Sequence, residues 1–181
     1  QLMYAGSALG DVVSGNDTAI DFGNQLGGGT YTVVATDTTT FCTSNMTGSA
    51  VITITPQPAV QTVSGGGAYC AGGTGVMVSL GSSESGIQYQ LMNGGTAVGG
   101  LVSGTGTTLS FGALTMAGTY TVVASPGGLC QTDMTGSADV IVSPLPAVHT
   151  VTGGGAYCAS GSGVSIMLDG SNTGIDYQLY M

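Results

Sequence analysis

The chain has 181 residues, including 34 glycines and nine acidic residues but no lysine or arginine, which gives a formal net charge of −9. A chain without basic side chains is a poor partner for nucleic acid or for an anionic membrane surface. Its apolar content of 42% is enough for a core, and no apolar run approaches the roughly 18 residues that span a bilayer, so we expect a folded protein without direct membrane insertion.

The predicted elements are short β-strands separated by glycine clusters. In chain order they are expected at residues 59–63, 75–80, 87–92, 107–111, 119–125 and 137–142, with a weaker candidate at 97–102. Alternation nominates a core, which consists of Val76, Val78, Leu80, Ile87, Tyr89, Leu91, Leu109, Phe111, Tyr120, Val122 and Ala124. No stretch has a helical apolar stripe. The pattern therefore predicts an all-β fold, with two packed sheets of the immunoglobulin-like type.

The same pattern repeats with a period of about 88 residues. The segment Gly65-Gly66-Gly67-Ala68-Tyr69-Cys70 returns at 153–158, and residues 30–35 return at 119–124. We expect a C-terminal part of one repeat at 1–56, a complete repeat at 57–144 and the N-terminal part of another at 145–181. Two Pro-x-Pro segments mark short, semi-rigid linkers, whose prolines are Pro56, Pro58, Pro144 and Pro146.

The two partial repeats are complementary. Residues 145–181 carry the counterparts of the first three strands of a repeat, and residues 1–56 carry the counterparts of the others. A partial sandwich does not bury its apolar face alone, so we expect each end to be completed by identical subunits or by adjoining repeats of a fibre.

The four cysteines follow the same period, and two pairings fit the sequence. One joins Cys70 to Cys130 within a repeat and leaves Cys42 and Cys158 to partners outside their partial repeats. The other joins Cys42 to Cys70 and Cys130 to Cys158 across a junction. We favour the first. Regular cysteines in a chain of low charge are typical of an oxidising, extracellular setting.

These motifs resemble a known family. The succession Gly-Gly-Gly-Ala-Tyr-Cys-Ala-Gly, Gly-Ile-Gln-Tyr-Gln-Leu, Ala-Gly-Thr-Tyr-Thr-Val-Val-Ala, a lone Cys and Met-Thr-Gly-Ser-Ala is similar to the immunoglobulin-like tandem repeats of giant surface proteins that Bacteroidota-type bacteria export by type IX secretion. The resemblance spans the whole chain. It implies a non-enzymatic extracellular array that serves as a stalk, adhesin or filament at the cell surface.

Few residues suggest chemistry. His149, the one histidine, is expected to be a surface linker residue, and the nine acids do not follow the spacing of a calcium loop, so neither catalytic residues, metal ligands nor a cofactor is predicted. Asp-Thr-small patterns make Thr18 and Thr38 candidates for O-linked glycans, and Asn-x-Thr patterns make Asn16 and Asn45 candidates for N-linked ones.

The leading functional hypothesis is an extracellular structural repeat of a filament or adhesin stalk that assembles head to tail by completing partial sandwiches. An adhesin module that binds a glycan or protein ligand, or a spacer domain of a secreted enzyme, is the alternative. Glycan recognition usually uses exposed tryptophan, which the chain lacks.

Overall fold

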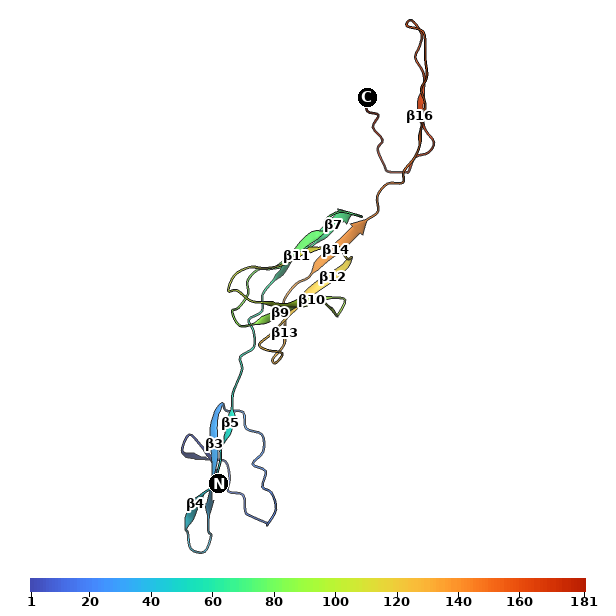
Figure 1. Cartoon of the computed structure of the whole chain (residues 1–181). Helices are drawn as coiled ribbons and strands as arrows, with labels where there is room; N and C mark the ends of the chain where they lie inside the picture. Colours follow the sequence, from blue (N-terminus) through green and yellow to red (C-terminus); the bar gives the residue numbers. More distant parts are fainter. The chain divides into compact units, whose positions relative to one another are not determined.

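The computed structural model describes residues 1–181 and contains β-strands but no helix (Figure 1). No segment therefore forms an apolar helix long enough to cross a membrane. The chain divides into two compact units, Gln1–Gln57 and Pro58–Met181. The prediction of an all-β fold is confirmed.

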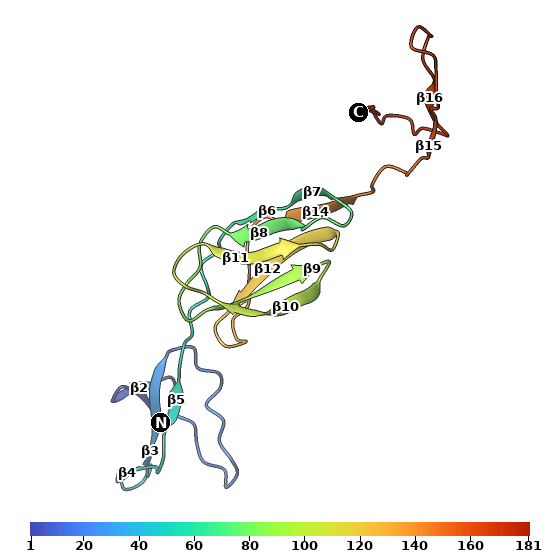
Figure 2. The ribbon, with the colours of Figure 1, turned by 45° about the horizontal axis from the view of Figure 1, so that its top comes forward.

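Residues 58–144, which we call the central sandwich, form two sheets (Figure 2). The larger sheet has the order β10-β9-β12-β14-β7, with the short β13 paired to β12, and the smaller has the order β11-β8-β6. The strand bounds are β6 Val63–Gly65, β7 Gly67–Cys70, β8 Val76–Leu80, β9 Gln88–Asn93, β10 Thr96–Ser103, β11 Leu109–Leu114, β12 Gly118–Ser125, β13 Thr132–Asp133 and β14 Ala138–Ser143. All named strand pairs are antiparallel except β14 with β7, which is parallel.

The core lies between the two sheets. Val78 and Leu80 of the smaller sheet and Tyr89, Val122 and Ala124 of the larger one are fully buried. Each set alternates along its strand with more exposed residues, as expected when one face of a strand packs and the other meets solvent. The predicted core positions are confirmed, with Val76, Ile87 and Phe111 partly buried at the edge.

At the glycine cluster, residues 65–67, the chain passes from the smaller sheet to the larger sheet. β6 pairs with β8, whereas β7 pairs with β14. Gly65 and Gly66 have φ values of 101° and 79°, and a Cβ at either position would strike the backbone of Met77 or Asp139. Only glycine fits both the dihedral angle and the space.

The strand predictions were wrong at the start of the repeat. Residues 59–61 are irregular, Thr62 forms an isolated bridge with Thr135, and β6 begins only at Val63. β7 was not predicted, because three adjacent glycines indicate a turn and nothing local reveals that the following Ala-Tyr-Cys pairs with a strand about 70 residues later. The other predicted strands, including the weaker candidate now seen as β10, are present.

The N-terminal unit, Gln1–Gln57, contains one sheet of five strands. β3 pairs with β1, β4 and β5, and β2 pairs with β1. The bounds are β1 Leu2–Tyr4, β2 Ser7–Leu9, β3 Gly29–Thr36, β4 Thr43–Asn45 and β5 Ala50–Ile52. Leu2 opposes Val33 here, as Leu91 opposes Val122 in the central sandwich, so the register of the larger sheet is reproduced one period earlier.

Residues 145–181, which we call the C-terminal segment, contain one hairpin formed by β15 Val151–Gly153 and β16 Ile166–Leu168. Its register matches that of β6 with β8: Val151 opposes Leu168 as Val63 opposes Leu80. Gly153 and Gly154 keep the positive φ values of Gly65 and Gly66. Each partial repeat thus forms the strand pairs for which it holds both partners.

Candidate assembly interface

The N-terminal unit has an open apolar groove on one face of its sheet. The groove encloses about 790 Å³, and a second hollow of about 850 Å³ shares part of its lining. Nine apolar residues line the groove: Leu2, Ile20, Phe22, Leu26, Tyr31, Val33, Met46, Ala50 and Ile52. The volume of this groove is within the range of small-molecule binding sites.

All of these residues except Leu26 have a counterpart in the closed core of the central sandwich. One period later the same positions are Leu91, Leu109, Phe111, Tyr120, Val122, Met134, Ala138 and Val140, and all of them belong to that core or pack against it. There, Val63, Val78 and Leu80 of the smaller sheet cover them. The N-terminal unit has no counterpart of β6 or β8. The groove is therefore the position of a core from which two of the three strands of the smaller sheet are missing.

Five of the positions (Ile20, Val33, Met46, Ala50 and Ile52) are more exposed than their counterparts, whereas Leu2 and Tyr31 remain buried. Ile20 is 41% exposed where Leu109 is 6% exposed, and Met46 is 44% exposed where Met134 is 5% exposed. Exposed apolar side chains that line one concave face are typical of an interaction surface.

The C-terminal segment carries the side chains that the groove lacks. Val151, Ile166 and Leu168 occupy the positions of Val63, Val78 and Leu80. Val151 is 64% and Ile166 is 52% exposed, although their counterparts are 4% and 0% exposed.

Two stretches lack the strand structure of their counterparts, and each lacks its pairing partner. Residues 20–25 correspond to β11, which pairs with β8, and they are irregular in a unit that has no β8. Residues 155–158 correspond to β7, which pairs with β14, and they are irregular in a segment that has no β14. The missing partners are present at β16 and β5, respectively. The two partial repeats are thus complementary in backbone pairing as well as in side chains.

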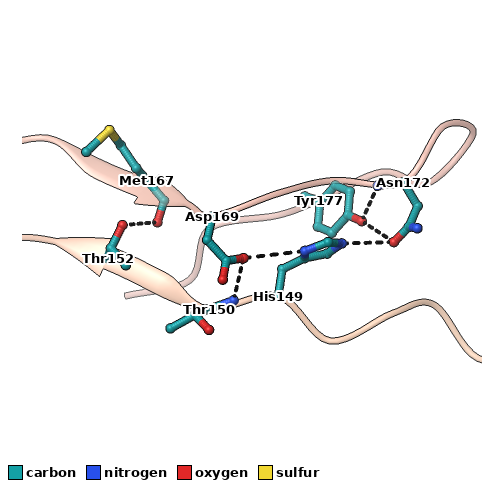
Figure 3. A network of polar contacts seen from close by, with 7 residues as sticks. All are labelled: His149, Thr150, Thr152, Met167, Asp169, Asn172 and Tyr177. Atoms are coloured by element: carbon teal, nitrogen blue, oxygen red, sulfur yellow. Dashed lines mark hydrogen bonds and ion pairs between the residues drawn. The ribbon is translucent and has the colours of Figure 1, made fainter.

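A polar network holds the start of the C-terminal segment in place (Figure 3). His149 Nε2 lies 3.0 Å from Asn172 Oδ1, and its Nδ1 lies 3.4 Å from Asp169 Oδ1. The backbone N–H of Thr150 donates to Asp169 Oδ1 at 2.9 Å, and that of Asn172 donates to the hydroxyl of Tyr177 at 2.9 Å. The Thr150 N–H and, to a smaller extent, His149 hold the pKa of Asp169 below its ordinary value.

This network was not predicted. His149 was expected to be a surface linker residue. The nearest sequence signal for the network is the presence of Asp169 at the position where the complete repeat has Gly81. Part of the arrangement is shared by both repeats, because Tyr89 accepts the backbone N–H of Glu84 as Tyr177 accepts that of Asn172. We infer a structural role, since these bonds tie the segment before β15 to the segment after β16.

The candidate glycosylation residues are all exposed. Thr18 donates its hydroxyl to Asn16 Oδ1 at 2.7 Å, and Asn45 ends β4. Thr38 lies in the β3–β4 turn, where Asp37 Oδ1 accepts the backbone N–H groups of Thr39 and Thr40. These bonds, that of Thr40 first, lower the pKa of Asp37.

The predicted linker prolines lie in irregular segments. Pro56, Pro144 and Pro146 are exposed, whereas Pro58 is buried.

The structure does not support the favoured cysteine pairing. Cys70 ends β7 beside Ser143 at the last residue of β14, whereas Cys130 lies in the β12–β13 loop near the start of β14. The two residues are therefore at opposite ends of the central sandwich, and Cys42, Cys70 and Cys158 are free thiols. The sequence showed the spacing but not which end of the sandwich each loop occupies.

No group of three or more histidine, cysteine or acidic side chains is placed to hold a metal ion. In the comparisons with known proteins, no protein-family model and no curated protein matches the chain.

Proposed function

We propose that the chain is a structural repeat of an extracellular filament or adhesin stalk, built from immunoglobulin-like sandwiches of about 88 residues. Successive copies assemble head to tail. The C-terminal segment of one copy occupies the groove of the N-terminal unit of the next copy, and together they form one closed sandwich.

The observation that carries this proposal is the complementarity of the two partial repeats. The groove lacks a valine, a second β-branched or aliphatic residue and a leucine from two paired strands, and the C-terminal segment offers Val151, Ile166 and Leu168 on such a pair. A second copy of the chain is thus the occupant that fits both the apolar side chains and the unpaired backbone. The segments overlap only at residues 178–181, which correspond to residues 1–4.

Two features favour head-to-tail assembly. The groove and the C-terminal segment are different surfaces of one chain, so a single contact between two copies is heterologous and leaves one of each surface free. A heterologous contact that does not close into a ring continues into a fibre. The β15–β16 hairpin and the His149–Asp169 network already order the C-terminal segment, which lowers the entropy that association must overcome.

The immunoglobulin-like assignment is supported by three details of the central sandwich. The first strand changes sheets, so that β7 pairs in parallel with the last strand, β14. The two sheets hold three and five main strands. Tyr120 donates its hydroxyl to the carbonyl oxygen of Met116 at 2.8 Å, as Tyr31 does to that of Gly27 at 2.7 Å, in the manner of a tyrosine corner.

Assembly of the purified 181-residue chain tests the proposal. This 17.6 kDa chain should form filaments that dissociate in denaturant, and electron microscopy should show a regular axial repeat of two sandwiches per chain. Chains that stay monomeric at high concentration would refute the head-to-tail contact. Native material with no fibrous form would refute the structural role.

A further inference from the structure

We infer that successive copies are joined by disulfide bonds between Cys70 of one copy and Cys42 of the next, and between Cys158 of the first and Cys130 of the next. The inference rests on the proposed head-to-tail assembly. It follows from the end of the sandwich at which each cysteine lies.

The central sandwich has two distinct ends. At the first end the chain enters, and Gln61 contacts Met134 and Thr135. At the second end the chain leaves through Ser143. Cys70 lies at the second end, because it is paired with Ser143.

Cys130 lies at the first end. β12 starts at the second end, where Gly118 opposes Val140, and runs back to the first end, where the β12–β13 loop follows it. In the partial repeats the same positions are Cys158 at the second end and Cys42 at the first. Every repeat therefore has one cysteine at each end.

Assembly brings opposite ends together. The second end of one sandwich is followed by a linker and then by the first end of the next sandwich, and these two ends carry a Cys70-type and a Cys130-type residue. We call the sandwich formed by the C-terminal segment of one copy and the N-terminal unit of the next copy the shared sandwich. Where a central sandwich is followed by a shared sandwich, Cys70 of the first copy pairs with Cys42 of the next copy. Where a shared sandwich is followed by a central one, Cys158 of the first copy pairs with Cys130 of the next copy.

The linker length allows the bond. Ser143 and His149 are six residues apart and span at most about 20 Å when extended. In the completed sandwich His149 takes the place of Gln61 and lies at the level of Met46. Cys42 is four residues from Met46 on a hairpin that extends back toward the linker, a reach of roughly 13 Å. The remaining distance is therefore at most about 7 Å, and the Cα–Cα separation in a disulfide is usually about 4.4–6.8 Å.

Bond formation requires an oxidant, for which glutathione disulfide serves. One thiolate attacks it and releases a glutathione thiol; the second cysteine thiolate then attacks the mixed disulfide and releases the other. In total two cysteine thiols are oxidised to one disulfide, and one glutathione disulfide is reduced to two thiols. Cys42 and Cys70 are exposed and accessible to this exchange.

The test compares full-length chains that retain different cysteine pairs. Equal amounts of ¹⁴N- and ¹⁵N-labelled chain are mixed, assembled, oxidised with glutathione disulfide and analysed on non-reducing gels, followed by peptide mapping with pepsin. The chain with Cys130→Ser and Cys158→Ser retains Cys42 and Cys70. It should give a crosslinked ladder in steps of the chain mass, and about half of its Cys42–Cys70 peptides should join the two isotopes.

The matched control carries Cys42→Ser and Cys158→Ser and retains Cys70 and Cys130. It should assemble equally well but remain uncrosslinked, with Cys70 open to alkylation. An internal Cys70–Cys130 peptide in this variant would overturn the inference, as would assembled chains whose Cys42 and Cys70 stay reduced.

A failure of the proposed function gives a different result. Assembly by sedimentation and electron microscopy is measured first in reducing buffer, where no disulfide contributes. Chains that never assemble there refute the head-to-tail contact, and the inference with it. Chains that assemble when reduced but do not crosslink when oxidised refute only the disulfides.

Discussion

Ile166→Ala tests the groove contact most directly. Ile166 is 52% exposed, and its counterpart Val78 is fully buried in the closed core. The substitution therefore costs the free chain little, because about half of the side chain is already in water. In the assembled state it removes buried methyl and methylene groups and leaves a cavity.

The magnitude follows from the area that assembly covers. Complete burial of an isoleucine side chain is worth about 1.5–3 kcal/mol, of which roughly half is gained only on assembly, and the cavity adds to that loss. We expect each contact between copies to weaken by about 1–3 kcal/mol. The critical concentration for assembly, measured by sedimentation, should rise by about 5-fold to 150-fold.

Met167→Ala is the matched control. Met167 is 59% exposed and adjacent in the same strand, but strand alternation puts it on the outer face, at the position of Ser79. It should change the critical concentration by less than about twofold. Equal effects of the two substitutions, or no effect of Ile166→Ala, would refute the argument that Ile166 enters the groove.

The other predictions concern the central sandwich and one turn. Leu80→Ala should lower the free energy of unfolding by about 2–5 kcal/mol in chemical denaturation, because Leu80 is fully buried, and a smaller loss would show that the core does not depend on it. Tyr120→Phe should cost about 1 kcal/mol in the same assay, since the Met116 carbonyl loses its donor, and an unchanged midpoint would argue against the tyrosine corner. Gly65→Ala should be destabilising by more than about 1 kcal/mol, because the residue has a positive φ and no room for a Cβ; a neutral result would contradict the crossing between sheets. The pKa of Asp37 is lowered in the folded state, so its contribution to the β3–β4 turn is present above the ordinary value of 3.8 and is lost as pH falls through the lower folded value; a carboxyl NMR titration with a midpoint at or above 3.8 would contradict this.

Local pattern was sufficient for most strands. Val76-Met77-Val78-Ser79-Leu80 alternates and is rich in β-branched residues, so both its conformation and its buried face follow from the sequence. The repeat also transferred information between copies, because β15 and β16 form in the register of β6 and β8. The alternation of apolar residues is a local pattern, and the repeat relates similar segments of the chain. Both can therefore be read directly from the sequence.

Long-range pairing was decided only by the tertiary structure. The parallel pairing of β7 with β14 joins two strands that are far apart in the sequence. This pairing decides at which end of the central sandwich Cys70 and Cys130 lie. The sequence by itself determined the strands, the core residues and the complementarity of the two partial repeats. The tertiary structure decided which face stays open as a groove and which cysteines lie at the same end, because both depend on how the strands are ordered in the sheets and on which partner strand is missing.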